Sequence, residues 1–302
     1  MNRWTAHYSL VLAAAGMLLT TASFAQIKVI TVDTNLADIA RQIGGARVAV
    51  ESLTRGTDDP HHIDPRPSMV VKLARADVFV RMGMDLDMWA DAVLERCGNR
   101  KVQRGGKGYA DCSGGIKPLE VPKGQLDPSL GDIHAFGNPH YLLDPANGVI
   151  AAAAIAGALI RVDPANRAEY ESRLAGFRQQ IATALKRWRE QLRPLQGANV
   201  VLYHRTWVYF TQRFGLREYD AIEPKPGVPP SPGHLQSLIA RMKKDGVRIV
   251  LFETFRDRRY ADRIGRETGA RLVVAPIAVE AEPDVTRYIG LFDRIVGRLL
   301  GS

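Results

Sequence analysis

Short apolar runs alternate with amphipathic stretches along most of the chain. Runs rich in Val, Ile and Leu predict buried strands, and stretches whose apolar residues recur every three or four positions predict helices. The predicted strands cover 27–33, 47–53, 78–80, 199–203, 248–252 and 271–275. The helices that alternate with them cover 36–43, 67–73, 88–97, 207–214, 234–244, 258–268 and 285–300. This alternation favours βαβ units and parallel sheets.

The alternation occurs twice, and a long helical region separates the two halves. Residues 98–139 are rich in Gly, Pro and Asp and are predicted to form a loop, after which an Ala-rich helix begins at Asp144-Pro145. A second Asp-Pro pair begins a helix that continues to Leu192 and would span about 42 Å at about 28 residues. The predicted fold is α/β, with two doubly wound parallel-sheet domains joined by this rigid helix and a site in the cleft between them. We place the first domain at 26–162, the connecting helix at 163–194 and the second domain at 195–302.

The first 25 residues have the features of a secretory signal peptide. Arg3 gives a positive start, residues 10–19 form an apolar segment, and small residues provide a cleavage site near Ala25. The apolar segment is too short for a typical membrane span. No cysteine follows it as a lipid attachment site. We therefore expect the mature chain to be released into a Gram-negative periplasm.

The formal charge of the chain is +9, with 41 Lys and Arg against 32 Asp and Glu. A basic balance can indicate a nucleic-acid-binding protein. Here the basic residues are scattered among acidic ones and form no block interleaved with aromatic residues. Together with the export signal, this distribution argues against nucleic acid as a partner.

The two cysteines, Cys97 and Cys112, are predicted to form a disulfide. An even number of cysteines in an exported protein usually indicates a disulfide, and this pair would close a short loop. Such a loop contributes about 3 kcal/mol to stability by the loop-closure argument. The alternative is a pair of soft metal ligands, but cysteine metal motifs normally place about two residues between the sulfurs.

Three histidines lie in distinctive turns that are far apart in sequence. His61 follows Asp-Asp-Pro, His140 follows Gly-Asn-Pro, and His204 directly follows a predicted strand. His61 also comes after a predicted strand, and ligands of open parallel sheets bind outside the carboxyl ends of strands. Two domains that face each other would bring these imidazoles together. Three neutral imidazoles favour a borderline-soft ion such as Zn²⁺.

Further motifs accompany these histidines in a fixed order along the chain. The segments are Asp59-Pro60-His61, 65–68, 72–77, Gly83 with Trp89, 138–145 and Tyr203-His204. In this order they resemble the metal-binding periplasmic proteins of ABC transporters that import zinc and manganese. The resemblance implies a monomeric binding protein without enzymatic activity, which delivers its ion to an inner-membrane ABC permease with a cytoplasmic ATPase. The histidine set is similar to that of zinc-type members, so Zn²⁺ is the expected substrate and Mn²⁺ the less favoured one.

The resemblance also implies a ligand set. Its first three members are His61, His140 and His204, and the third is a histidine in zinc-type proteins but often a glutamate in manganese-type ones. The fourth ligand of the family, usually an aspartate, aligns with Pro276 here. We predict that Glu253, after a strand of the second domain, takes this position, with a water molecule as the alternative. Less favoured substitutes are Glu280, Glu282 and Asp284.

The remaining histidines and one Pro-rich segment receive other interpretations. His62 is predicted to be exposed or to lie behind the ligands, and His234 to have a structural role at a helix start. Many zinc-type relatives carry a His-rich acidic stretch before the second ligand, whereas residues 98–139 contain one histidine only, His134. The segment 223–234 is predicted to order a loop at the mouth of the cleft or to form a docking surface for the membrane partner.

Three alternative functions stay open at this point. A Mn²⁺- or Fe²⁺-binding counterpart would need more carboxylate ligands than the sequence places near the histidines. A secreted zinc hydrolase could use three histidines and a water molecule, but the chain has no His-Glu-x-x-His motif and offers only Glu253 as a general base. An adhesin or metal-storage protein would have the same site without a transporter.

Overall fold

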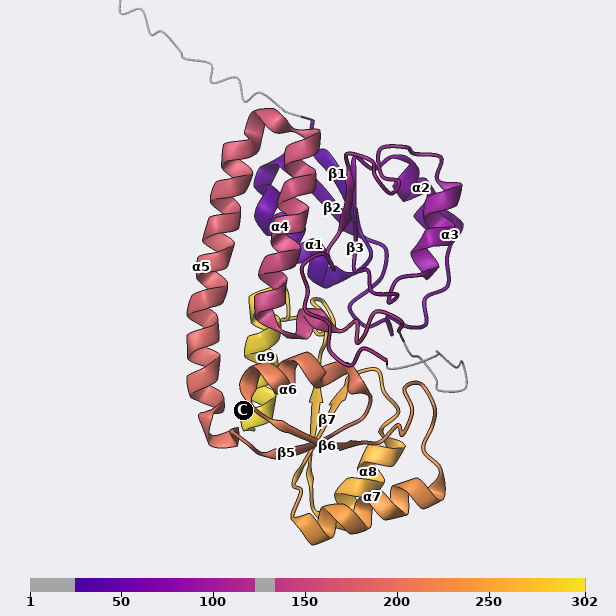
Figure 1. Ribbon diagram of the computed structural model, residues 1–302, viewed down its shortest axis with the longest axis vertical. Coiled ribbons are helices and arrows are strands. Elements are labelled where there is room, and N and C mark those ends of the chain that lie inside the picture. The colour runs from indigo at the N-terminus through magenta and orange to yellow at the C-terminus, as the bar shows by residue number, and fades with distance from the viewer. Residues whose placement is uncertain (1–24, 123–133, 302) are drawn as a thin grey trace, which may run out of the picture.

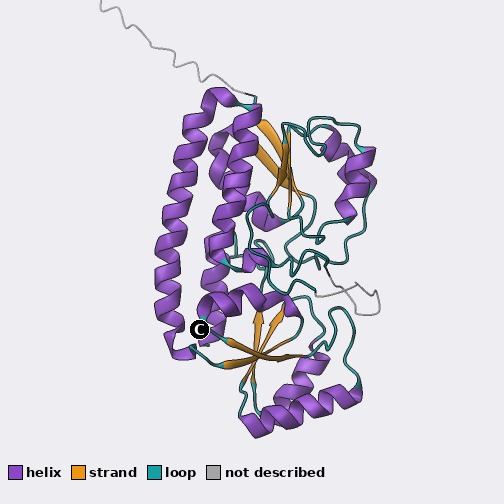
Figure 2. Cartoon of the chain, viewed as in Figure 1, coloured by secondary structure: helices purple, strands orange, loops and turns teal. Residues whose placement is uncertain are grey.

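The computed structural model describes residues 25–122 and 134–301. Two α/β domains are stacked along the long axis of the molecule, and one long helix, α5 (Arg167–Leu192), lies beside both (Figure 1, Figure 2). Each domain is built on a four-stranded sheet whose strands all pair in parallel. The predicted fold class is therefore confirmed. The predicted signal peptide lies outside the described residues, apart from the exposed Ala25.

The first sheet has the strand order β2-β1-β3-β4. Its strands are β1 (Ile27–Thr31), β2 (Val48–Ser52), β3 (Val78–Arg81) and β4 (Tyr109–Asp111). The helices of this half are α1 (Thr34–Gly44), α2 (Pro67–Ala74), α3 (Trp89–Arg96) and α4 (Pro145–Val162). Two aspartates start helices, because the Asp33 side chain accepts a hydrogen bond from the Leu36 amide and the Asp144 side chain accepts one from the Ala146 amide.

The second sheet repeats this arrangement in the order β6-β5-β7-β8. Its strands are β5 (Asn199–Leu202), β6 (Arg217–Ala221), β7 (Ile249–Glu253) and β8 (Arg271–Ala275). The helices are α6 (Val208–Phe214), α7 (Pro232–Asp245), α8 (Arg258–Thr268) and α9 (Tyr288–Leu300). The arrowhead of β7 points toward the first domain in Figure 1, so the carboxyl end of this central strand faces the domain boundary.

Helix α5 is 26 residues long, which corresponds to about 39 Å. It packs against α4 and α1 of the first half and against α9 of the second. The residues of its buried face recur at helical spacing and are Tyr170, Phe177, Ile181, Ala184, Trp188 and Leu192. The helix therefore contacts both halves of the chain, as predicted for a connecting helix. It begins slightly later than predicted, because residues 164–166 form a 3-10 turn.

One described helix, α4, is long and apolar enough by length and composition to cross a membrane. In the structure it packs against α1, α5 and β4, and its residues Ala151, Ile155 and Leu159 are fully buried. This packing explains its apolar composition, because a helix covered on several sides by protein carries few polar residues. α4 is a core helix of the first domain.

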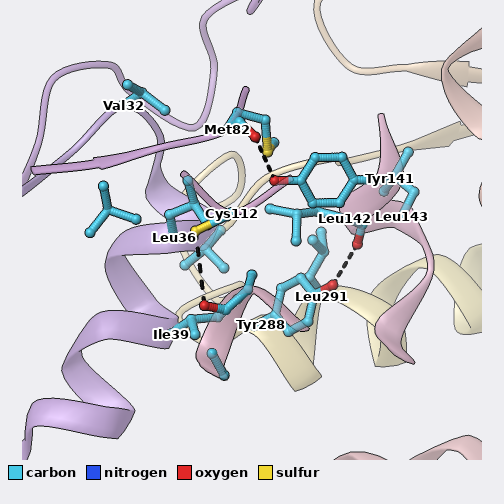
Figure 3. Close-up of a cluster of buried hydrophobic side chains, with 14 of the residues drawn as sticks. Val32, Leu36, Ile39, Met82, Cys112, Tyr141, Leu142, Leu143, Tyr288 and Leu291 are labelled. Atoms are coloured by element: carbon cyan, nitrogen blue, oxygen red, sulfur yellow. Dashed lines mark hydrogen bonds between the residues drawn. The ribbon is translucent and has the colours of Figure 1, made fainter. Parts of the chain in front are cut away.

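The main hydrophobic core is continuous between the two domains and includes the last helix, α9. Figure 3 shows how this helix reaches the first half of the chain: the Tyr288 hydroxyl donates a hydrogen bond to the Leu142 carbonyl at 2.5 Å. In the same cluster, the Tyr141 hydroxyl donates to the Met82 carbonyl at 2.8 Å. The C-terminal helix thus completes packing that begins in the first domain.

The predicted disulfide is wrong, because Cys97 and Cys112 are both free, buried thiols. Cys97 follows α3, and its thiol donates a hydrogen bond to the Leu94 carbonyl at 3.1 Å. Cys112 follows β4, and its thiol lies 3.9 Å from the Ala151 carbonyl of α4. The two sulfurs therefore point at different helices. Their short separation in sequence did not bring them together, because the intervening loop and strand carry Cys112 across to α4.

Candidate metal centre

The three predicted histidine ligands lie together at the boundary between the domains. His61 is in the loop after β2, His140 directly precedes the 3-10 turn that leads into α4, and His204 follows β5. Among the described residues they form one group, in which a nitrogen of each ring lies within 4.8 Å of the others. No carboxylate belongs to this group. The two domains thus bring together side chains that are far apart in sequence.

The three rings face one another at close range. Nε2 of His61 lies 3.0 Å from Nε2 of His140. The ring centroids are 4.9 Å apart for His61 and His140, 5.1 Å for His61 and His204, and 5.5 Å for His140 and His204. His140 and His204 are buried, and His61 is half-buried. Three imidazole nitrogens in this arrangement can converge on one ion, as in protein sites for Zn²⁺.

Asn138 fixes the backbone that carries His140 and ties it to the second domain. Its Oδ1 accepts a hydrogen bond from the His140 amide at 3.0 Å, and its Nδ2 donates to the Arg205 carbonyl at 2.7 Å. The Tyr209 hydroxyl of α6 donates to the Asn138 carbonyl at 2.9 Å. Because Arg205 is the neighbour of His204, one asparagine holds histidines from both domains in a fixed relation.

Glu223, a residue that the sequence pattern does not mark as part of the site, holds the third histidine. Its Oε2 lies 2.8 Å from Nδ1 of His204, and both side chains are buried. Burial acts to raise the pKa of Glu223, but the hydrogen bond from His204 and the charge of Arg256 outweigh it and lower the pKa below its ordinary value. A carboxylate on Nδ1 keeps the ring proton there and leaves Nε2 available for an ion. The available signal was its position after β6, at the same sheet edge as His204.

Arg256 connects three carboxylates around the histidines. Its Nη1 lies 3.5 Å from Oδ2 of Asp59 and 3.5 Å from Oε1 of Glu223, and its Nε lies 3.4 Å from Oε2 of Glu253. Asp59 also accepts a hydrogen bond from the His61 amide at 3.1 Å. Arg256 therefore links the turn that carries the first histidine to two acids of the second domain.

Glu253, the predicted fourth ligand, lies at the end of β7 and is wholly buried. Burial raises the pKa of its carboxyl group, and the charges of Arg256 and His204 act in the opposite direction. The structure pairs Glu253 with Arg256 and does not place its oxygens in the histidine group. Its role as a metal ligand stays a prediction.

Burial holds His61 and His140 in the neutral form. It lowers the pKa of both rings well below the ordinary histidine value. The neighbouring histidines and the guanidinium of Arg256 lower both values further. A neutral imidazole offers the lone pair that a metal ion needs, so fewer protons have to leave when the ion binds.

A comparison of the chain with known families decides what kind of protein carries this centre. The family model described as "Zinc-uptake complex component A periplasmic" (ZnuA) matches residues 29–300. The chain belongs to this family. Its members are binding components of ABC transporters, so the chain is a periplasmic metal-binding component of such a transporter and is not an enzyme. The interpretation as a secreted zinc hydrolase is excluded.

Relatives of this ZnuA-family chain carry names with different metals. The manganese ABC transporter substrate-binding lipoprotein PsaA of Streptococcus pneumoniae is 24% identical over 269 residues, which cover 87% of this chain and 84% of PsaA. The iron-binding protein YfeA of Yersinia pestis is 27% identical over 303 residues, which cover 94% of this chain and 92% of YfeA. The similarity extends over nearly the full length of each protein.

Solved structures of the same kind share the fold. The crystal structure of ZnuA, at 23% identity, has a TM-score of 0.76 and covers 92% of this chain and 99% of its own. The Mn-bound periplasmic metal binding protein from Candidatus Liberibacter asiaticus, at 20% identity, has a TM-score of 0.73. The match covers 91% of this chain and 99% of that protein's chain. The arrangement of two parallel-sheet domains and a long helix is therefore that of the ZnuA-type proteins.

Other residues considered in the sequence lie away from the histidine group. The His62 side chain is 67% exposed and lies beside Asp59. His234 is in the first turn of α7, where its amide donates to Ser231 and its ring contacts the Ala221 carbonyl, as predicted for a structural histidine. The acids near the end of the chain pair with arginines: Glu280 with Arg41, and Glu282 and Asp284 with Arg294.

Proposed function

We propose that this protein binds Zn²⁺ as its transported ion and delivers it to the permease of an ABC importer. The observation that carries the proposal is the group of His61, His140 and His204, in which imidazole nitrogens converge without a carboxylate. Zn²⁺ binds well to imidazole nitrogen, whereas harder ions such as Mn²⁺ prefer carboxylate and carbonyl oxygen. The three histidines would supply three positions of a tetrahedral site.

The charges around the histidines support a divalent cation. Three acids, Asp59, Glu223 and Glu253, surround one cation, Arg256. Glu223 keeps its negative charge because its pKa is lowered. With the three acids ionised, their charge exceeds that of Arg256, and a bound dication would offset the difference. These acids need not contact the ion to act on it.

We further propose that residues 1–25 are a signal peptide cleaved near Ala25, and that the protein acts as a monomer. Its partners would be an inner-membrane permease and a cytoplasmic ATPase. N-terminal sequencing of protein from a periplasmic extract would measure the cleavage site. In proteoliposomes that contain the permease and its ATPase, the Zn²⁺-loaded protein should stimulate ATP hydrolysis, and protein without a functional site should not.

The direct test is metal analysis of the purified periplasmic protein, followed by competition with a calibrated zinc chelator. We expect one Zn²⁺ per chain and a higher affinity for Zn²⁺ than for Mn²⁺. Replacing any one of His61, His140 or His204 with Ala should weaken Zn²⁺ binding at least about tenfold. A triple Ala variant with wild-type affinity would show that the site is assigned wrongly.

The second candidate function is binding of Mn²⁺ or Fe²⁺, which the names of PsaA and YfeA favour. In this chain it requires a carboxylate oxygen on the ion, and Glu253 is the predicted source. The same titrations distinguish the two functions. Tighter binding of Mn²⁺ than of Zn²⁺, lost in Glu253→Gln, would support the manganese function instead.

A further inference from the structure

A fourth histidine, His134, lies against the three histidines of the metal centre. Its ring centroid is 5.3 Å from that of His61, with an angle of 36° between the ring planes. This separation falls within the range of 4.9 to 5.5 Å found among the three grouped rings. Its Nε2 atom is buried. His61 therefore contacts three other imidazoles rather than two.

His134 also shares a cavity with two of the grouped histidines. His134, His140 and His204 line a space of about 260 Å³ beside Asn138 and Arg205. A water molecule occupies about 30 Å³ in the liquid, so this space can hold an ion with several waters. It also leaves room for the side chain of His134 to change its rotamer. The histidine thus faces the volume through which an ion would reach the other rings.

The backbone of His134 is held by the same network that positions His140. The Gly137 amide donates to the His134 carbonyl at 3.1 Å and closes a turn, in which Gly137 has a φ of +100° that favours glycine. The next residue, Asn138, donates its amide to the Leu119 carbonyl at 2.8 Å. Because Asn138 is also fixed to Arg205, the turn that carries His134 is anchored to both walls of the centre.

No carboxylate oxygen belongs to the group formed by the three histidines among the described residues, and Glu253 is paired with Arg256. We propose that His134 supplies the fourth ligand, so that the centre holds its ion with four imidazoles. His134 is not part of the group whose ring nitrogens all lie within 4.8 Å of one another. Its side chain therefore has to rotate toward the ion to become a ligand. The inference rests on the proposed zinc function and specifies it.

Four imidazoles would strengthen the preference of the site for Zn²⁺ over Mn²⁺. Each oxygen ligand that is replaced by nitrogen favours borderline ions over hard ones, so the four-histidine centre should discriminate against Mn²⁺ more strongly than a centre with one carboxylate. The fourth position would then be taken by a residue of the first domain. This gives His134 a role in selecting the metal as well as in holding it.

The test is X-ray absorption spectroscopy and chelator competition on the Zn²⁺-loaded full chain. The wild-type spectrum should show four imidazoles on the ion, and that of His134→Gln three imidazoles with one oxygen. Zn²⁺ affinity should fall at least about tenfold in His134→Gln. The matched control is His62→Gln, because His62 is also near the centre but exposed, and its affinity and spectrum should be unchanged. The melting temperature of both metal-free variants checks that they fold.

A gain of function provides a second readout. His134→Asp offers the ion a carboxylate in place of the fourth imidazole, so the ratio of Zn²⁺ to Mn²⁺ affinity should fall compared with the wild type. Three imidazoles in the wild-type spectrum, or wild-type affinity in His134→Gln, would overturn the role of His134 and leave zinc binding by the other three intact. A wild-type protein that does not bind Zn²⁺ would overturn the proposed function itself, and with it this inference.

Discussion

The guanidinium of Arg256 lies 3.5 Å from the carboxylate of Asp59, and this ion pair crosses from one domain to the other. The Arg256 side chain is only 11% exposed and also pairs with Glu223 and Glu253. A buried acid without a cation is costly, so the pair matters most when no metal ion is present. Arg256 and a bound dication therefore act on the same group of acids.

We predict that Arg256→Gln destabilises the metal-free protein by about 3 kcal/mol, since it leaves three acids without their cation. The metal-bound protein should lose less, because the ion still balances part of the charge. Thermal unfolding with and without Zn²⁺ measures this difference, and the rise in Tm on adding Zn²⁺ should be larger than in the wild type. Arg256→Lys is the control that keeps the charge. An equal loss in both states would contradict the prediction.

Glu223→Gln should lower Zn²⁺ affinity by about 10- to 100-fold, although Glu223 does not belong to the histidine group. The amide presents a weaker acceptor to Nδ1 of His204 and removes a negative charge from the centre. Competition with a chelator measures the change. Glu190→Gln, at a side chain that is 70% exposed, is the matched control and should bind as the wild type does. Equal affinity in both variants would show that Glu223 does not orient the ligand.

The free energy of unfolding of the metal-free protein should decrease as the pH falls below about 6.5. His61 and His140 have pKa values well below 6.5 in the folded protein and near 6.5 when unfolded. Below that pH the unfolded chain binds protons that the folded chain does not, so acid favours unfolding, whereas above pH 7.5 the two rings have no effect. Urea unfolding at pH 7.5 and 5.5 measures this. The double variant His61→Gln/His140→Gln should lose less unfolding free energy between these pH values than the wild type does. An equal loss in both proteins would show that these two rings do not cause the pH dependence.

The hydrophobic pattern predicted most of the elements but not two strands. β4 has three residues and lies in a Gly-rich region, so it has no run that periodicity could detect. β6 carries Arg217, Glu218 and Asp220 and buries fully only its last residue, which makes it look like a loop. Both are edge strands, where side chains meet solvent and the apolar signal is weak. The strands that carry most of the packing were predicted because they are buried on both faces.

The candidate centre was predicted only in part, because part of it depends on contacts between distant segments. His61, His140 and His204 could be found because each lies in a recognisable turn. Glu223 was missed, since its partner is a ring nitrogen 19 residues away and the strand before it, β6, was not predicted. Arg256 acts through contacts with the other domain, and such contacts depend on how the two domains pack. Local patterns indicate ligands more readily than the residues that orient them.

Gly148→Ala should destabilise the protein by about 1 to 3 kcal/mol, because a methyl group there would collide with the ring of Tyr288. Gly157→Ala is the control in the same helix, α4, where the added atom meets only the end of the Arg161 side chain at 3.5 Å. That variant should gain up to about 1 kcal/mol from helix propensity. Urea unfolding of the two variants measures the opposite effects, and equal stabilities would argue against close contact between α4 and α9.

Two free thiols per chain should react with a thiol reagent after unfolding without reductant. In the folded protein Cys112 should react slowly, because burial raises its thiol pKa well above the ordinary value. Reductant should leave the melting temperature unchanged. Fewer than one reactive thiol per unfolded chain would instead indicate the disulfide between Cys97 and Cys112 that the sequence predicts.

The contact of Tyr288 with Leu142 means that a helix made late in synthesis is needed to finish the packing of the first half. Leu291, Phe292 and Ile295 of α9 belong to the core that the first domain shares. During synthesis the first half keeps apolar surface uncovered until α9 is available to pack on it. A polypeptide that ends early would keep that surface exposed to chaperones and proteases. Folding of the first half is therefore coupled to the arrival of α9.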